Sequence, residues 1–393
     1  MKKHEIWELQ SMQAAPLSVK IKMTQSRIRE WVNYYGEDGV YISFSGGKDS
    51  TVLLDIVRQE YPNIPAVFVD VPTQYPELRE FVQTFENVEI LKPKMTFMQV
   101  CEKYGFPLIS KEVSERVHYA QKYLTAWKQA REAATDRQTD RQTDRQTGAG
   151  LYAVCDLLGM REMRKKGIPS EIMDALIAAD NYKINELLGK HKKQNGDPSM
   201  FNYRKYLFMV DAPFQIGNQC CDVMKKTPLK RYEHRTHRRP FTAVMASESK
   251  LRTSQWLAAG CNAFESKRPI SNPMAFWTEQ DVLLYIYTRN LPICSVYGDV
   301  VKDNEVAGQM DLEDLGLFDL GAPVLKTTGC KRTGCMLCGF GCHLEKDGES
   351  RFQLLKQTHH GMYKMLDVVK NNGVTFREAI DWTNEHGNLH IRY

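Results

Sequence analysis

Residues 40–57 read Val-Tyr-Ile-Ser-Phe-Ser-Gly-Gly-Lys-Asp-Ser-Thr-Val-Leu-Leu-Asp-Ile-Val, and this stretch decides the fold. An apolar run typical of a strand leads into a glycine turn, and a run typical of a helix begins directly after it. Gly46 and Gly47 let the backbone approach an anion, while the first helical turn presents free N–H groups and the positive end of the helix dipole. Lys48 adds a positive charge, and the hydroxyls of Ser45, Ser50 and Thr51 add further donors. The stretch predicts a pyrophosphate-binding loop; a turn that uses glycine for geometry alone is the simpler alternative.

Length and composition set broad limits. A chain of 393 residues, 42% of them hydrophobic, can form one large domain with insertions or two domains. No apolar stretch approaches the roughly 18 residues needed to span a bilayer, and residues 1–5 do not open a signal peptide, so we expect a cytoplasmic protein without a membrane segment. In that reducing compartment the ten cysteines indicate metal or redox chemistry. The net charge of +5 is too small to indicate nucleic acid.

Strand and helix patterns alternate around the loop. Helical spacing of Ile21, Ile28, Trp31 and Val32 predicts a helix over 17–35. Continuous apolar runs predict buried strands at 66–71 and 87–91, with a helix at 76–85 between them. This alternation predicts an α/β fold with a doubly wound, mainly parallel sheet, in which ligands bind outside the carboxyl ends of the strands.

The remaining chain is expected to divide into four parts. Residues 1–118 and 206–300 would form the two halves of the nucleotide-binding domain, around a helical insertion at 119–205, with a cysteine-rich loop and helices at 301–393. Tandem Thr-Asp-Arg-Gln repeats at 135–147 hold no apolar residue and are interpreted as a dispensable linker. Helical patterns follow at 151–166 and 170–188. The sheet is expected to resume from Leu207, with a strand at 241–245. Thr278 is expected to cap a helix that has Asp281 in its first turn. Helical segments are expected at 352–369 and 375–385.

Six cysteines form two clusters. Cys335 and Cys338 have the spacing that lets two thiolates face one metal, and glycines flank them. Cys220 and Cys221 could complete a four-thiolate site for a [4Fe–4S] cluster or for zinc. Alternatively, Cys330 and Cys342 could close a local zinc knuckle with the first pair.

A basic run covers residues 225–239, directly after the adjacent cysteines. Its charge could neutralise a cluster and substrate phosphates or contact a nucleic-acid backbone, and a solvated basic face is the simpler alternative.

Together these motifs resemble the PP-loop proteins of the adenine nucleotide alpha-hydrolase-like superfamily, in the branch of the phosphoadenosine phosphosulfate (PAPS) reductases. The resemblance covers most of the chain apart from the repeats, and the cysteine pattern with Lys225 is similar to the [4Fe–4S] motif of adenylyl-sulfate (APS) reductases. The segments that carry it are Ser45–Ser50, Phe68–Asp70, Pro107–Lys111, Ser247–Ser249 with Arg252, Pro273, Trp277–Val282, Cys220, Cys221, Pro228, Leu229, Cys335 and Cys338.

Two departures bear on the reaction. The C-terminal segment Glu385–His390 resembles the reductase tail but lacks the cysteine that reductases use as nucleophile. The loop has a lysine and a second glycine, as in relatives that bind ATP. The resemblance therefore implies ATP and Mg²⁺, with the iron–sulfur PP-loop subunit of DNA phosphorothioation systems and the related transfer RNA thiolases as functional analogues.

The implied reaction is adenylyl transfer with release of pyrophosphate, followed by transfer of sulfur to a nucleic acid. Lys48 would stabilise the pyrophosphate, Asp49 would orient the loop or Mg²⁺, and Asp70 would bind the ribose or the metal. Arg252 and Lys111 would hold the substrate. The alternatives are a sulfonucleotide reductase that uses Cys330 or Cys342 and forms sulfite, and a regulatory or defence protein that acts with a ParB-like partner; an oligomer is compatible with each.

Overall fold

The computed structural model describes residues 4–135, 170–303 and 323–393, except 194, 198 and 200. The chain forms two compact units, which are described separately: the first unit contains Met1–Lys94 and Lys225–Cys335, and the second unit contains Met95–Met224 and Met336–Tyr393. Most of the repeat segment and the helix expected at 151–166 lie outside the described residues. The four-part division of the sequence stays a prediction.

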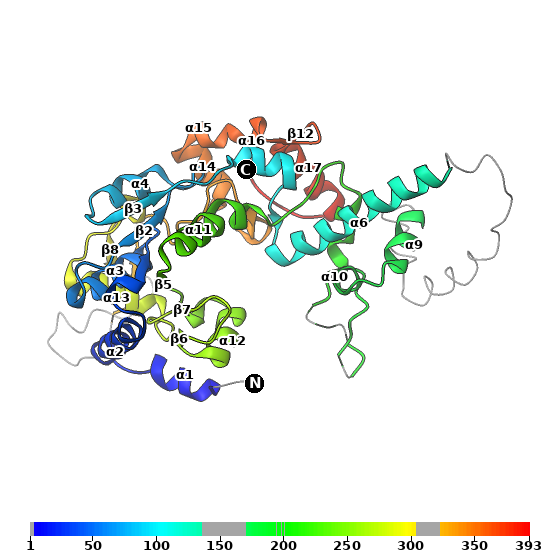
Figure 1. Ribbon diagram of the computed structural model, residues 1–393. Coiled ribbons are helices and arrows are strands. Elements are labelled where there is room, and N and C mark those ends of the chain that lie inside the picture. Colours follow the sequence, from blue (N-terminus) through cyan, green and yellow to red (C-terminus); the bar gives the residue numbers. More distant parts are fainter. Residues whose placement is uncertain (1–3, 136–169, 194, 198, 200, 304–322) are drawn as a thin grey trace. The chain divides into compact units, whose positions relative to one another are not determined.

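The first unit is built on a six-stranded sheet in the order β3-β2-β1-β5-β7-β6 (Figure 1). Every neighbouring pair is parallel except β6 with β7. The mainly parallel α/β fold predicted from the sequence is therefore confirmed. The strands are β1 (Val40–Ser43), β2 (Ala66–Val69), β3 (Val88–Leu91), β5 (Arg239–Phe241), β6 (Asn262–Ala263) and β7 (Ile270–Ser271).

Helices cover both faces of this sheet, because successive side chains of a buried strand point to opposite sides. On one face Val40 and Ile42 of β1 lie in the main core, to which α2, α3 and α13 contribute. On the other face Tyr41 and Val67 pack against Tyr232 of α11. The helices of this unit are α1 (Ile6–Gln13), α2 (Leu17–Tyr35), α3 (Lys48–Glu60), α4 (Pro76–Gln83), α11 (Thr227–Thr236), α12 (Lys250–Ala259) and α13 (Glu279–Arg289).

The predicted helix over 17–35 is confirmed as α2, with Ile28, Trp31 and Val32 buried and Ile21 packed at the edge of the core. The predicted cap of α13 is confirmed as well. Thr278 Oγ1 accepts a hydrogen bond from the Asp281 amide, and Asp281 accepts one from the Thr278 amide at 2.7 Å. An antiparallel hairpin of β8 (Val300–Lys302) and β9 (Leu325–Thr327) follows α13.

Three expectations from the sequence are corrected. The strand expected at 241–245 ends at Phe241, the last residue paired with β7, and residues 242–245 continue as a loop. The sheet does not resume at Leu207, because Arg204–Asp211 is a 3₁₀ helix; a short buried apolar run fits either structure. The helical pattern at 170–188 is two helices, separated at Asp180, which has a φ of +40°.

The second unit is mainly helical, with a parallel pair of short strands, β4 and β10, and a β11–β12 hairpin. Its core includes the stacked rings of Phe106 and Phe376. Among the described residues, no helix is long and apolar enough to cross a membrane. The elements of this unit are α5 (Phe97–Tyr104), β4 (Leu108–Ile109), α6 (Lys111–Thr135), α9 (Ser170–Ala178), α10 (Tyr182–Leu187), β10 (Gly339–Phe340), α14 (Arg351–Thr358), α15 (His360–Tyr363), α16 (Met365–Val368), β11 (Lys370–Asn371), β12 (Val374–Thr375) and α17 (Phe376–Gly387).

Candidate nucleotide-binding site

The loop Ser45–Ser50 connects the carboxyl end of β1 to the first turn of α3. Its own groups hold it in shape. The Ser45 amide donates to Ser50 Oγ at 3.2 Å, the Gly47 amide donates to Ser45 Oγ at 3.3 Å, and Ser50 Oγ donates to the Gly47 carbonyl at 2.9 Å. These hydrogen bonds fix the loop, so the first N–H groups of α3 are in position to bind an anion.

Gly46 is required by the geometry of this turn. Its φ is +72°, and a Cβ at this position would lie 3.0 Å from Val82 Cγ2 and 3.3 Å from the Leu78 carbonyl oxygen, both on α4. L-residues rarely adopt such a φ, and atoms of α4 would have to shift by a few tenths of an ångström to admit a Cβ. Glycine therefore lets the loop pass close to α4 without strain.

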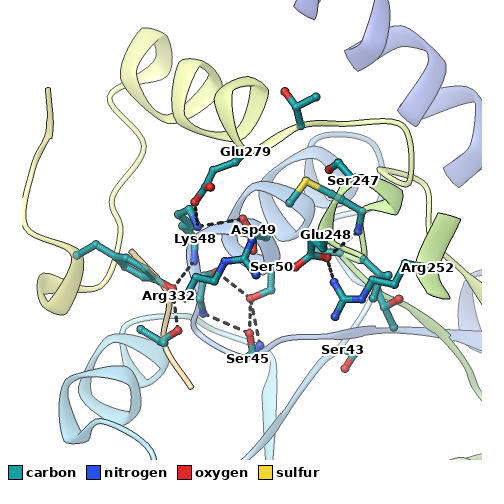
Figure 2. A pocket seen from close by; sticks show the side chains of 18 residues that line it. Ser43, Ser45, Lys48, Asp49, Ser50, Ser247, Glu248, Arg252, Glu279 and Arg332 are labelled. Carbon is teal, nitrogen blue, oxygen red and sulfur yellow. Dashed lines mark hydrogen bonds and ion pairs between the residues drawn. The ribbon is translucent and has the colours of Figure 1, made fainter. Parts of the chain in front are cut away.

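A cavity of about 530 Å³ opens beside the loop (Figure 2), a volume typical of small-molecule sites. It combines the phosphate-binding loop with residues that follow β5, with the start of α13 and with a segment near Cys335. The lining residues are Ser43, Ser45, Gly47, Lys48, Asp49, Ser50, Thr242, Ala243, Val244, Met245, Ser247, Glu248, Arg252, Thr278, Glu279, Tyr297, Arg332 and Thr333.

Lys48 is the central cation of the loop and is 3% exposed. Its Nζ lies 3.1 Å from Glu279 Oε1 and 3.6 Å from Asp49 Oδ1, and it donates to the Lys331 carbonyl at 3.2 Å. Figure 2 shows Glu279 beside Lys48. The two carboxylates thus neutralise the buried ammonium of Lys48 at the positive end of the α3 dipole. Phosphate oxygens bound at this position would be stabilised by the same ammonium and dipole.

Asp49 lies next to Lys48 and also faces the cavity. Its Oδ1 is buried and has no hydrogen-bond partner among the described residues. Burial raises the pKa of Asp49 above its ordinary value, and the nearby Lys48 opposes this shift. The Asp49 Oδ1 ion-pairs with Lys48 but accepts no hydrogen bond from the described residues, and a carboxylate beside a phosphate loop fits Mg²⁺, which proteins hold by one or two carboxylates together with substrate phosphates.

A second concentration of positive charge comes from Arg252 of α12 and Arg332. Arg252 forms an ion pair with Glu248 (Figure 2). Burial and the nearby Arg332 both lower the pKa of Arg252. Two guanidinium groups placed close together destabilise each other unless an anion lies between them, so this part of the cavity is suited to a second anionic group.

Tyr297 and Thr333 connect the segment 330–335, which has a cysteine at each end, to the phosphate loop through hydrogen bonds. The Lys48 amide donates to the Tyr297 hydroxyl at 3.3 Å, and that hydroxyl lies 2.7 Å from Thr333 Oγ1. Burial raises the pKa of Tyr297 to about 12, so its hydroxyl stays protonated at neutral pH. The sequence analysis did not single out Tyr297, Arg332 or Thr333; the position of Arg332 between Cys330 and Cys335 was the available signal.

The structure brings six of the predicted residues together around the cavity: Ser45, Gly47, Lys48, Asp49, Ser50 and Arg252. Thr51 directs its hydroxyl to the Gly47 carbonyl at 3.1 Å instead. Asp70 accepts two hydrogen bonds from Arg79, at 2.7 and 3.0 Å, and does not line the cavity. Lys111 begins α6 of the second unit, so its predicted role beside the substrate stays a prediction.

The clustered cysteines divide between the units. Cys330 and Cys335 belong to the first unit, and Cys220, Cys221, Cys338 and Cys342 belong to the second. Within the described residues, no group of three or more His, Cys, Asp or Glu side chains is arranged to hold a metal ion. Because the predicted ligands come from both units, the iron–sulfur or zinc site stays a prediction, and we derive no step through it.

The fold and this cavity define the class of protein: an α/β protein with a phosphate-binding loop at the carboxyl edge of its sheet. The family model of the phosphoadenosine phosphosulfate reductase domain matches residues 39–139 and 171–339, more than half of the sequence. The chain therefore belongs to the PAPS reductase family, as its sequence motifs predicted.

Other comparisons add less. The crystal structure of phosphoadenylyl-sulfate (PAPS) reductase from Candida auris, in a phosphate complex, is similar over 76% of this chain and 87% of its own, with 13% identity and a TM-score of 0.32. No curated protein matches the sequence. The family assignment thus rests on the family model.

Proposed function

We propose that the first unit binds ATP and transfers its adenylyl group to an acceptor, with release of pyrophosphate. The observation that carries this proposal is Lys48, a buried ammonium at the first position of α3 within a loop that has two successive glycines. This arrangement offers a leaving pyrophosphate both a full positive charge and the helix N-terminus.

In the proposed reaction an acceptor oxygen attacks the α-phosphorus of ATP in line. The bond from that phosphorus to the oxygen bridging the α- and β-phosphates breaks, and its electron pair leaves with pyrophosphate. Negative charge grows on the leaving group, so the ammonium of Lys48 and the amide groups at the start of α3 stabilise the transition state more than the ground state. The phosphates would displace Glu279, whose Oε1 lies 3.1 Å from Lys48 Nζ.

Two further parts of the cavity would complete the site. The carboxylate of Asp49, which lies beside the loop and lines the cavity, would hold Mg²⁺, which would neutralise phosphate charge. Arg252 and Arg332 would bind another anionic group, from the nucleotide or from the acceptor. Each role comes from a side chain that lines the same cavity as the loop.

The family also suggests the purpose of activation, which we propose is sulfur transfer, with a nucleic acid as the acceptor. The [4Fe–4S] cluster or zinc on Cys220, Cys221, Cys335 and Cys338, with Cys330 and Cys342 as alternates, remains a prediction from the sequence. The ParB-like partner is likewise a prediction from the sequence. None of these is needed for the adenylyl-transfer step itself.

A second candidate function is sulfonucleotide reduction to sulfite with an external thiol reductant. Cys330 favours it, because this thiol lies in the first unit, 3.8 Å from the Tyr75 hydroxyl, and starts the segment whose Arg332 and Thr333 line the cavity. The thiol would have to replace the C-terminal cysteine that this chain lacks.

The test uses the full chain incubated with ATP and Mg²⁺, with and without a mixture of oligonucleotides, and separates the products by chromatography. We expect pyrophosphate and an equal amount of AMP, either bound to the oligonucleotide or released from it by water, and exchange of labelled pyrophosphate into ATP that depends on the oligonucleotide. Lys48→Ala should lower the rate by about 100-fold or more, as expected when a preorganised charge is lost from the transition state. Lys22→Ala, an exposed lysine of α2, is the matched control. Formation of ADP, or equal rates for Lys48→Ala and Lys22→Ala, would refute the proposal. Formation of sulfite from PAPS or APS and a thiol, without cleavage of ATP to AMP and pyrophosphate, would establish sulfonucleotide reduction instead.

A further inference from the structure

The outer face of α11 carries exposed positive charge. Lys230, Arg231, His234 and Arg235 of this helix are exposed, as is Lys226, the residue before it. Residues four apart lie one above the other on a helix, so Lys226, Lys230 and His234 form one row, and Arg231 and Arg235 form a second row beside it. The opposite side of the helix buries Pro228 and Tyr232 against the sheet.

The segment 225–239 has no exposed acidic residue that could neutralise this positive charge. Glu233 is the only acidic residue between 225 and 239, and it points inward, where it accepts hydrogen bonds from Tyr41 at 2.7 Å and from Arg268 at 2.8 Å. Arg235 pairs with Glu89 of β3. Lys230 and Arg231 have no ion pair or hydrogen bond with any residue that the structure describes, in contrast to surface arginines such as Arg29, which pairs with Glu60.

The chain after β3 extends the charged face. Lys92 and Lys94 are exposed and likewise lack ion pairs within the described ranges. Lys92 and Leu91 line a small cavity of about 220 Å³ together with Arg231, Arg235 and the ring of Tyr232. Three cations therefore converge on one hollow that has room for a phosphate group.

The direction of α11 relates this surface to the nucleotide site. Arg235 lies beside Glu89 within β3, whereas Arg231, one turn earlier, lies beside Lys92, just beyond the carboxyl end of β3. Lys230 and Lys226 therefore continue toward the carboxyl edge of the sheet. The phosphate-binding loop follows the carboxyl end of β1, which is separated from β3 by β2. Two strand spacings amount to about 10 Å, so both features lie on one edge.

We propose that Lys92, Lys94, Lys226, Lys230, Arg231 and Arg235 form a binding surface for the phosphate backbone of a nucleic acid. This proposal rests on the proposed function, because it identifies the acceptor class that the adenylyl-transfer site would act on. A polyanion fits better than a single small anion, since the charges extend over more than two helical turns and along the adjoining chain. All six side chains are lysine or arginine, which contact backbone phosphates through their charge, so we expect binding that is largely independent of sequence.

The test measures binding of fluorescently labelled single-stranded and duplex oligonucleotides to the full chain by anisotropy, without ATP, over a series of salt concentrations. Each phosphate contact adds about 0.9 to the slope of log affinity against log salt for duplex DNA and about 0.7 for a single strand. The double variant Lys230→Gln/Arg231→Gln should therefore weaken binding and lower the slope by between about 1.4 and 1.8. Lys92→Gln/Lys94→Gln, which alters a different element, should have a similar effect.

The matched control is Lys22→Gln/Lys267→Gln, which removes the same charge from exposed positions on α2 and in the β6–β7 loop and should leave the slope unchanged. Absence of binding by the unaltered protein, or equal losses in all three variants, would overturn the proposal. Binding of anionic phospholipid vesicles that depends on Lys230 and Arg231, when oligonucleotide binding does not, would overturn it too. Because the assay contains no ATP, its outcome is separate from that of the ATP-cleavage test.

Discussion

Replacing Gly46 by alanine tests whether the phosphate-binding loop depends on one glycine conformation. Two separate costs arise at this position. With φ at +72°, an L-residue is strained, at a cost of roughly 1–2 kcal/mol. The added Cβ would also lie 3.0 Å from Val82 Cγ2 and 3.3 Å from the Leu78 carbonyl oxygen, and forcing a methyl group into a filled region costs roughly 1–3 kcal/mol. We expect Gly46→Ala to lower the free energy of unfolding by about 3 kcal/mol.

Gly36→Ala supplies the matched control. Gly36 follows α2 with φ at +77°, yet a Cβ there would have nothing within 4 Å. An alanine at Gly36 therefore has a backbone cost of the same order, roughly 1–2 kcal/mol, without the steric one. The difference between the two variants therefore isolates the contact with α4.

The assay is thermal unfolding of both variants without ligand, followed by ATP binding. A loss of 1 kcal/mol lowers the melting temperature by about 2–4 °C in a domain of 150–250 residues, so Gly46→Ala should melt several degrees below Gly36→Ala. Gly46→Ala should also bind ATP more weakly, because relief of the clash moves the amide groups that face the cavity, whereas Gly36→Ala should bind normally. Equal melting temperatures together with equal ATP affinities would refute the reasoning.

Two further predictions concern ion pairs and protonation. Lys20 is 3% exposed and pairs with Asp281 at 2.7 Å. Lys20→Met should lower the free energy of unfolding by about 3 kcal/mol in urea titrations, because it leaves a carboxylate without its buried partner. Arg29→Ala, which breaks an exposed pair, should lower it by less than about 1 kcal/mol, and equal losses for the two variants would contradict this account. Burial raises the pKa of Asp49 above its ordinary value of 3.8, so its favourable contribution to stability is present below pH 3.8 and is lost as pH rises through the folded pKa. Asp49→Asn should therefore melt progressively higher relative to the unaltered protein as pH increases over this window, and a constant difference would refute the shift.

The sequence predicted the nucleotide-binding half of the fold well, because its signals there are local. The run from Val40 to Val57 holds a strand, a turn and a helix within eighteen residues, and each part appears at the predicted place as β1, the loop and α3. The α2 helix matched at both ends, since the apolar spacing of Ile28, Trp31 and Val32 persists along its length. Periodicity was less informative for short apolar runs such as 206–210, where a buried strand and a buried 3₁₀ turn look alike.

The other wall of the site could not be predicted from local patterns. Tyr297, Arg332 and Thr333 come from the 3₁₀ turn at Ser295–Tyr297 and from the segment before Cys335, both nearly 250 residues or more from Lys48 along the chain. Only the folded arrangement shows that the Tyr297 hydroxyl joins the Lys48 amide to Thr333. Such contacts depend on tertiary packing, and a single sequence carries no record of them. For the same reason, cysteine spacing alone did not determine which thiols meet.

The balance of charge in the cavity bears on the choice between ATP and a sulfonucleotide. Three cations, Lys48, Arg252 and Arg332, are matched by three carboxylates that line the same cavity: Asp49, Glu248 and Glu279. A site built to hold a bare anionic nucleotide would gain by leaving such carboxylates out, because each one repels the ligand. Carboxylates are instead what a magnesium-bound triphosphate requires, since they hold the ion while the cations and the helix terminus bind the phosphates. Asp49 is the one of the three carboxylates that lies within the loop itself, and this balance is why we propose cleavage of ATP and treat reduction of a sulfonucleotide as the second candidate.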